Sequence, residues 1–522
     1  MRVRHLAGIA SLGFGLWALA AEAAPPSGNK VLLIGFDGGE WSVIEDLWSR
    51  GDLPTLKRLV SEGAHAPLGT TYGSSPVIWT TVATGHVPEV HGITGFVVAT
   101  DEGDVPVSSE MRKVPAIWNL TSTAGLKTNV VGYWGSWPAE EVNGVNVSER
   151  CQADVDRCAT PAEWNTKVEE SLAEANETHR GLWPGEQNFA PEDRVTTQWA
   201  PQLAKDFDFM AMYVHGTDPN SHKYWRYYRP SDFDTPPDPT QLKLHKDRVP
   251  RAYRSFDTVL KRTLARAGED TNVIIVSDHG FHALDEVRVK VTFDLDKLLV
   301  ELGYAVYEGD KVDVTQSQMW TWGSALNESR KRVRVGMKGR DAGGTHTPES
   351  AAKLRSELEA RLAGVTYASG KPAFRVEDAN PRDIDRGGDF VIRSNEDGVS
   401  RALVIDGEKH KGIVRGWVEN SGGHSGDPPG VFIAHGPDIN PDADLADIEI
   451  HDITPTLLYA LGLPVGKDMT GEPSTGLFTE DFQQRNPLTT VPTYGDRAAT
   501  TATSTDEDAA MIEQLRQLGY LD

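Results

Sequence analysis

The sequence has 522 residues, of which 39% are hydrophobic and 25% charged, a composition that excludes a fibrous or disordered chain. It carries 76 Asp and Glu against 52 Lys and Arg, a net charge of −24 at pH 7. This balance excludes nucleic-acid coating, because a protein that coats nucleic acid must neutralise phosphates with cations. A small anionic substrate is not excluded, since a bound metal ion can invert the local field.

Residues 1–23 have the pattern of a secretory signal peptide. The basic residues Arg2 and Arg4 precede an apolar stretch at 6–20, and Ala21-Glu22-Ala23 has the small-x-small form of a cleavage site. The apolar stretch is short for a bilayer crossing, which needs about 20 residues, so an uncleaved anchor is the less favoured alternative. We therefore expect an exported protein, periplasmic or extracellular, with no stable membrane span in the mature chain.

Short, continuous apolar runs predict strands that are buried on both faces of a parallel sheet, beginning with KVLLIGF at 30–36. Helical segments lie between the runs. One begins near Pro250, and another starts at Asp452 and stops at Gly462. The alternation predicts an α/β fold with a mostly parallel central sheet and helices on both faces. The further predicted strands are Asn129–Tyr133, Phe207–Val214, Val273–Val276 and Val431–Ala434.

Cys151 and Cys158, the two cysteines of the sequence, lie close together. In an oxidising compartment such a pair is expected to form a local disulfide, and two thiols alone cannot build a Cys-rich zinc site.

Several segments depart from the strand–helix alternation. Residues 286–414 contain Trp320 and Trp322, a basic cluster and a Gly- and Asp-rich run, which indicates an inserted cap. The last segment is rich in Thr, Pro and Asp and has little to bury. The predicted units are a core at 29–285 with a polar insertion at about 137–200, a cap subdomain at 286–414, the rest of the core at 415–485, and a linker with a short closing helix (Met511, Leu515, Leu518) at 486–522.

Acidic and histidine side chains stand where the predicted strands end or begin. In open α/β sheets, ligands bind at the carboxyl ends of the strands, where such side chains converge. An isolated Asp after a strand is more often a helix cap than a ligand, but the recurrence of these residue types favours a metal site. Carboxylate and imidazole groups suit two divalent cations, Zn²⁺ first, with Mn²⁺ or Fe as substitutes. The predicted ligands are Asp37, Asp218, His222, Asp278, His279 and His424.

Ser75 is the predicted nucleophile. It precedes Pro76, and this pair predicts a helix that has Ser75 as its N-cap and Pro76 as its first residue. A hydroxyl there faces free backbone N–H groups and the positive end of the helix dipole, which suit a phosphate. The alternative is that Ser75 only caps the helix. Beside a metal ion that lowers the pKa of the hydroxyl, the nucleophile interpretation is favoured.

The chain resembles the alkaline phosphatase superfamily, most closely its type I phosphodiesterase and nucleotide pyrophosphatase branch. The resemblance lies in LLIGFDGG, SSPVIWTTVATGHVPEVHGITG, YVHGTDPNSH, VIIVSDHGF and SGGHSG, which follow the family's order and cover most of the core. In that family the nucleophile lies about nine residues before a Thr-Gly pair, here Thr84-Gly85, which implies Ser75. The resemblance implies that Asp37, Asp278 and His279 hold one metal ion together with Ser75, and that Asp218, His222 and His424 hold the other.

The function that this resemblance implies is a two-metal phosphohydrolase of a small-molecule phosphoric ester, acting through a phosphorylated Ser75. Sulfatases of the superfamily carry Arg where this chain has Trp79, which disfavours their chemistry. No Arg stands beside Ser75 to hold a phosphate dianion, which favours diesters, yet Ile78 replaces the Asn of nucleotide pyrophosphatases. The alternatives are a phosphomonoesterase, a phosphonate or sulfate-ester hydrolase, a phosphoryl-group transferase and, from another class, a non-catalytic metal-binding protein.

Overall fold

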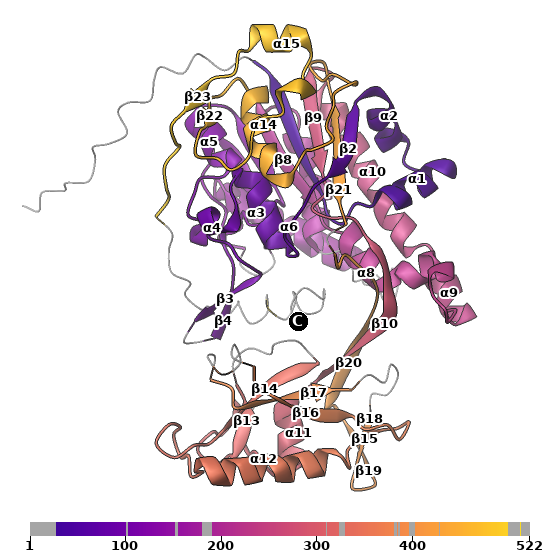
Figure 1. The fold of residues 1–522 in the computed structure, drawn as a ribbon, viewed down its shortest axis with the longest axis vertical. Coiled ribbons are helices and arrows are strands. Elements are labelled where there is room, and N and C mark those ends of the chain that lie inside the picture. Colours follow the sequence, from indigo (N-terminus) through magenta and orange to yellow (C-terminus); the bar gives the residue numbers. More distant parts are fainter. Residues whose placement is uncertain are drawn as a thin grey trace, which may run out of the picture.

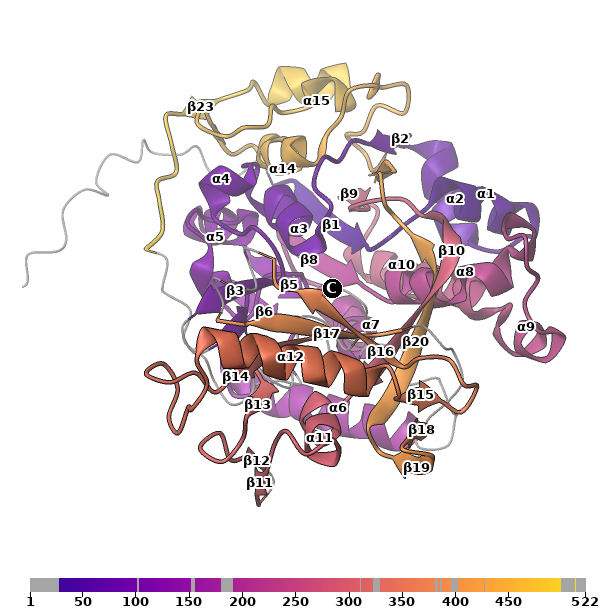
Figure 2. The ribbon, with the colours of Figure 1, turned by 60° about the horizontal axis from the view of Figure 1, so that its bottom comes forward.

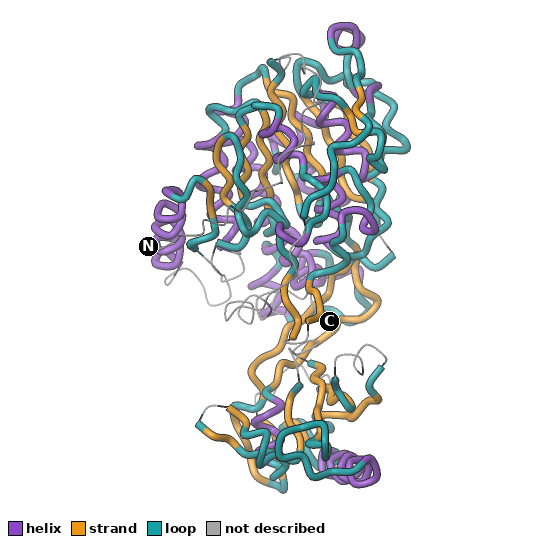
Figure 3. Tube along the Cα trace, turned by 90° about the vertical axis from the view of Figure 1, so that its left-hand side faces the viewer, coloured by secondary structure: helices purple, strands orange, loops and turns teal. Residues whose placement is uncertain are grey.

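The computed structural model describes residues 28–100, 103–151, 155–179, 191–309, 311–322, 329–380, 384, 387–395, 402–426, 428–498 and 512. The predicted signal peptide and all but one residue of the predicted closing helix lie outside these ranges. Figure 1 shows a larger body above a smaller one, joined by two long strands, β10 (His282–Phe293) and β20 (Val414–Gly423). The connection is equally narrow in the side view of Figure 3. Among the helices of the described residues, none combines the length and the hydropathy that a bilayer crossing requires.

The larger body is built on an eight-stranded sheet with helices on both faces, which confirms the predicted α/β class. Five neighbouring strands, from β9 to β6, run parallel, whereas β21 pairs antiparallel with both of its neighbours. In order across the sheet the strands are β2 (Ala64–Leu68), β21 (Gly430–His435), β9 (Thr271–Val276), β1 (Lys30–Phe36), β8 (Phe209–Val214), β5 (Thr128–Val131), β6 (Gly144–Val147) and β7 (Ala159–Thr160).

The side chains of β1 show why its sequence is apolar throughout. Val31 and Leu33 pack into the hydrophobic cluster on one face of the sheet, and Leu32 and Ile34 pack into the cluster on the other, because successive strand side chains point to opposite faces. The first face is covered by α3 (Ser75–Thr84), α5 (Ile117–Thr123) and α14 (Ile453–Ala460), and the second by α1 (Trp41–Ser49), α2 (Pro54–Glu62), α7 (Pro191–Leu203), α8 (Thr217–Tyr228) and α10 (Arg248–Ala267).

The described part of segment 137–200 belongs to the core rather than forming the predicted polar insertion. It supplies β6 and β7 to the sheet, and α7 packs beside α6 (Glu163–His179) and α10 on one face. The strands are short and carry few apolar residues, of which Val147 and Ala159 are buried. Their sequence therefore lacks the long apolar runs of the central strands.

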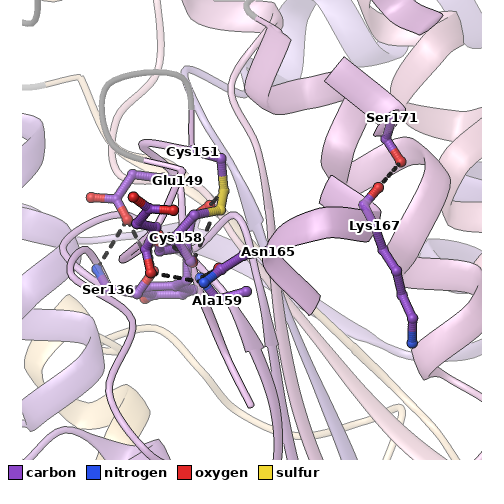
Figure 4. Close-up of a disulfide and its surroundings, with 11 residues drawn as sticks. Ser136, Glu149, Cys151, Cys158, Ala159, Asn165, Lys167 and Ser171 are labelled. Carbon is purple, nitrogen blue, oxygen red and sulfur yellow. Dashed lines mark hydrogen bonds between the residues drawn. A yellow bond between two sulfur atoms is a disulfide. The ribbon is translucent and has the colours of Figure 1, made fainter. Parts of the chain in front are cut away.

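The predicted disulfide between Cys151 and Cys158 is present, and it closes the loop between β6 and β7. Figure 4 shows the bridge beside Glu149 and Ser136. The buried Glu149 carboxylate accepts hydrogen bonds from the backbone N–H groups of Gly135 and Ser136, at 3.0 and 3.2 Å. The loop closed by the disulfide is thus tied to the segment that follows β5.

Residues 486–498 are bound to the core, in contrast to the mobile linker that their composition predicts. The strand β23 (Thr490–Val491) pairs with β22 (Val465–Gly466), and Arg497 lies 2.7 Å from the carboxylate of Glu140. These contacts are backbone hydrogen bonds and an ion pair. The polar composition of the segment does not reveal them, because they need little apolar burial.

The smaller body has its own hydrophobic cluster, and the chain enters it through β10 and returns through the antiparallel β20. Figure 2 shows helix α12 lying across its outer side. The predicted cap bounds of 286–414 stay a prediction, since β10 and β20 extend into both bodies. Its elements are α11 (Leu295–Glu301), α12 (Pro348–Leu362), a sheet of β13 (Met319–Thr321), β14 (Arg330–Val335), β17 (Phe390–Ser394) and β16 (Phe374–Asp378), and a sheet of β15 (Thr366–Tyr367), β18 (Ala402–Ile405) and β19 (Glu408–Lys411).

Candidate metal centre

The six predicted ligands lie at one edge of the central sheet. Asp37 follows β1, and Asp278 and His279 follow β9, so all three stand at the carboxyl ends of parallel strands. Asp218 and His222 are one turn apart on α8, which follows β8. His424 comes before β21, and the antiparallel direction of this strand places its beginning at the edge where the others end.

The side chains meet in two groups that share Asp218. The ligand atoms of Asp218, His222 and His424 lie within 4.8 Å of one another, and so do those of Asp37, Asp218 and His279. Asp278 adjoins the second group, because its Oδ2 lies 3.4 Å from His279 Nε2. The arrangement therefore brings the six predicted ligands into one site.

The buried oxygen and nitrogen atoms of this site fit divalent cations. Asp37 and Asp278 are fully buried and His279 is 2% exposed. Asp37 Oδ1, Asp278 Oδ2 and His279 Nε2 make no hydrogen bond within the described residues. Buried carboxylates are costly unless a charge or a metal ion compensates them. Carboxylate oxygens and imidazole nitrogens are also the ligand types that Zn²⁺ and Mn²⁺ accept.

Two of the histidines are oriented by backbone carbonyls. His222 Nδ1 donates to the Gly422 carbonyl at 3.0 Å, and His279 Nδ1 donates to the Gly280 carbonyl at 3.0 Å. A carbonyl only accepts, so these bonds place the proton of each neutral ring on Nδ1 and leave Nε2 for a metal ion. His424 stacks on His279 with the ring centroids 3.7 Å apart, which fixes the third imidazole.

The ionisable groups influence one another strongly. Burial, together with the charges of Asp278 and Asp218, raises the pKa of Asp37 well above its usual value. Burial also acts to raise the pKa of Asp218, but the nearby His222, His279 and His424 outweigh it and lower that pKa. Burial, then His279 and His222, lower the pKa of His424 to about 3. The metal-free site thus tends to hold a proton on Asp37 and keeps the His424 ring neutral.

We expect the zinc affinity of the protein to fall as the pH is lowered below the raised pKa of Asp37. A cation must then displace the Asp37 proton, which weakens binding by up to about tenfold per pH unit. His424 adds nothing to this loss above about pH 4, because its pKa is about 3. Competition with a chelator of known proton affinity, between pH 5 and 8, measures the slope. An affinity that does not change over this range would contradict the expectation.

Helix α3 begins one residue earlier than predicted. Ser74 is its N-cap and Ser75 its first residue, so Ser75 does not cap the helix. The backbone N–H groups of Val77 and Ile78 donate to the Ser74 carbonyl, at 3.0 and 3.1 Å. These two N–H groups are therefore not free for a phosphate, and the helix dipole and the backbone N–H of Ser75 remain of the predicted anion site.

Hydrogen bonds connect α3 to α14, and α14 to the residue before β1. Near the end of α3, the Val82 carbonyl accepts a hydrogen bond from Thr454 at the start of α14, at 2.7 Å. At the end of α14, the Ala460 carbonyl accepts from Asn29, which precedes β1, at 2.9 Å. These contacts hold α3 on this face of the sheet, and the position of Ser75 beside the metal ligands stays a prediction.

Several residues that support the ligands have no signal in the sequence. Tyr213 donates a hydrogen bond from its hydroxyl to Asp37 Oδ2, and Thr217 donates to the Asp37 carbonyl. The Glu40 carboxylate accepts from the backbone of Phe281, at 3.0 Å, and so joins the loops that follow β1 and β9. A tyrosine inside an apolar strand is typical of a core residue. The one available signal is that a buried tyrosine hydroxyl usually has a hydrogen-bond partner.

This fold and this set of buried ligands indicate a metal-binding α/β protein, and a comparison with protein families identifies its family. The family model of type I phosphodiesterase / nucleotide pyrophosphatase matches residues 31–412, most of the chain. The chain belongs to this family and is a hydrolase of phosphoric esters. No curated protein matches it in sequence.

Solved structures that are similar to this chain in fold have low sequence identity to it. Human ectonucleotide pyrophosphatase / phosphodiesterase 5 is 15% identical, with a TM-score of 0.41, over 86% of this chain and 100% of that chain. The murine protein, as an inactive variant in complex with AMP, gives the same values. Phosphonoacetate hydrolase from Sinorhizobium meliloti 1021, in complex with phosphonoformate, is 18% identical, with a TM-score of 0.40, over 84% of this chain and 96% of that chain.

Proposed function

We propose that the protein is an exported two-metal phosphodiesterase or nucleotide pyrophosphatase in which Ser75 is the nucleophile. The observation that supports this most is the meeting of six carboxylate and imidazole groups in one site. Asp37, Asp278 and His279 would hold one cation together with Ser75. Asp218, His222 and His424 would hold the other. Zn²⁺ is the expected metal, because the ligands are mixed nitrogen and oxygen donors.

The two cations, when bound, supply the positive charge that lowers the pKa of the Ser75 hydroxyl and balances the phosphoryl oxygens. The Ser75 Oγ attacks phosphorus opposite the leaving oxygen, forming a phosphoserine diester as the leaving alcohol departs with a proton. Water then attacks the phosphorus from the vacated side, releases a phosphate monoester and restores the Ser75 hydroxyl. The positive end of the α3 dipole, at the N-terminus of the helix, favours the negative charge on the phosphoryl oxygens.

A panel of aryl esters tests this function. Zinc-loaded protein is expected to hydrolyse bis-p-nitrophenyl phosphate faster than p-nitrophenyl phosphate, and both faster than p-nitrophenyl sulfate. A diester carries one negative charge fewer than a monoester. It therefore suits a site in which no arginine stands beside Ser75 in the sequence. A faster monoester reaction would reassign the protein to the phosphomonoesterases. Zinc-bound protein that turns over none of the esters would contradict the proposal.

We also propose that the chain is exported and that residues 1–23 are its signal peptide, removed during export. The basic and apolar pattern of this segment supports the proposal, and the disulfide between Cys151 and Cys158 suits an oxidising compartment. Protein recovered from the source cells is expected to begin at Ala24, as read by N-terminal sequencing. Recovery from the cytosol with Met1 retained and the two thiols reduced would contradict it.

A further inference from the structure

Asp37 is held by two hydroxyl groups outside the predicted metal ligands, one at its carboxylate and one at its main-chain carbonyl. The Tyr213 hydroxyl donates to Oδ2, and the Thr217 hydroxyl donates to the Asp37 main-chain carbonyl. His215 Nε2 lies farther from the same Oδ2, at 3.6 Å, beyond hydrogen-bond distance. Of the described side chains at this carboxylate, Tyr213 is therefore the one that hydrogen-bonds Oδ2 directly.

The ring of Tyr213 is fixed by close packing. It contacts the rings of Trp79 and Tyr133, with centroids 5.0 and 6.3 Å apart. It also lies against Gly35 on the neighbouring strand β1, where a Cβ atom would come within 2.7 Å of Tyr213 Cδ2. A larger residue at position 35 would push the ring away. A rigid ring whose neighbours leave no room to rotate delivers its hydroxyl to one place.

The other carboxylate oxygen of Asp37 differs from Oδ2 in its contacts. Oδ1 makes no hydrogen bond within the described residues, and Asp37 offers a ligand atom within 4.8 Å of those of Asp218 and His279. The two oxygens therefore have separate tasks. Oδ2 is held by a neutral donor, which leaves Oδ1 as the oxygen available to a cation.

We propose that Tyr213, with Thr217, is a positioning residue that fixes the Asp37 carboxylate so that Oδ1 is presented to a divalent cation. The inference rests on the proposed function, because it takes Asp37 to be a metal ligand. Tyr213 touches neither the cation nor the substrate in this account and acts only through Asp37. Hydrogen-bond partners of metal ligands typically change metal affinity by about 10–100-fold when removed.

The variant Tyr213→Phe tests this role, and Tyr133→Phe is its matched control. Both tyrosines are buried and pack in one aromatic cluster with Trp79, but the Tyr133 hydroxyl lies 3.5 Å from the Trp79 carbonyl rather than at Asp37. Competition with a chromogenic chelator should show a zinc dissociation constant raised about 10–100-fold in Tyr213→Phe and unchanged in Tyr133→Phe. With Co²⁺ bound, the visible absorption bands should shift only in Tyr213→Phe.

Kinetics at saturating zinc separate positioning from a general loss of structure. In Tyr213→Phe, kcat for the diester is expected to fall while KM stays close to the wild-type value, because the substrate makes no contact with the tyrosine. If Tyr213→Phe does not fold, Thr217→Val is the second test variant. It should also weaken zinc binding. The inference would be overturned if a folded Tyr213→Phe or Thr217→Val protein had the same zinc affinity and the same Co²⁺ spectrum as the wild type. Failure of the wild type to bind zinc or to cleave any ester would instead overturn the proposed function.

Discussion

Replacing Ser75 by alanine is expected to lower kcat for bis-p-nitrophenyl phosphate by about 10³-fold or more, because the substitution removes the atom that attacks phosphorus. Ser75 is 3% exposed and begins α3, so alanine fits the site and keeps the helix. The metal content at saturating zinc should stay at two ions per chain, since six other side chains remain. Rapid quenching with a labelled diester should trap phosphate on the wild-type protein and none on Ser75→Ala.

The neighbouring serine provides the control. Ser74 is the N-cap of α3, and its buried Oγ has no hydrogen-bond partner in the described part of the chain. Ser74→Ala therefore removes no bond and should retain the wild-type rate. A Ser75→Ala protein that keeps wild-type turnover, or a Ser74→Ala protein that loses it, would show that the nucleophile is another group.

The second large effect is expected from Asp218→Asn. Asp218 belongs to both groups of ligand atoms, so one substitution removes a negative charge from both ion positions. Asparagine has nearly the same size, but its neutral amide is a much weaker ligand for Zn²⁺ than a carboxylate. We expect fewer than two zinc ions per chain, measured by plasma mass spectrometry after dialysis, and a loss of turnover of about 10³-fold or more.

A second buried aspartate separates metal binding from stability. Asp257 on α10 is 6% exposed and accepts hydrogen bonds from the backbone N–H groups of Leu56 and Thr55, at 2.7 and 3.3 Å, at the start of α2. Asp257→Asn weakens this cap and should lower the free energy of unfolding by about 1 kcal/mol. Its zinc content should not change. Full zinc occupancy in Asp218→Asn would contradict the shared position of Asp218.

The ligands that follow parallel strands are predictable from sequence because the signal is local. Asp37 comes directly after an apolar run and Asp278 two residues after another, and the rule for open α/β sheets then brings them to one edge. His424 precedes its predicted strand instead of following it, and it reaches the site for a different reason. Its strand runs antiparallel, a direction that an apolar run of six residues does not encode.

The supporting contacts could not be predicted, because their partners are far apart along the chain. Tyr213 and Asp37 are separated by 176 positions, and a tyrosine in an apolar strand looks like a core residue. The same limit explains residues 486–498, where the polar sequence predicts a linker but Arg497 finds Glu140. Hydrophobic patterns report which face is buried; they do not report which polar groups meet there.

The most direct test of the metal centre is a crystal structure of the zinc-loaded protein with anomalous diffraction data at the zinc edge. Two anomalous peaks are predicted, one among Asp218, His222 and His424 and the other beside Asp37, Asp278 and His279. The Ser75 Oγ should lie within bonding distance of the second peak. Zinc bound elsewhere, or a single peak that leaves one of these groups empty, would contradict a two-metal site that activates Ser75.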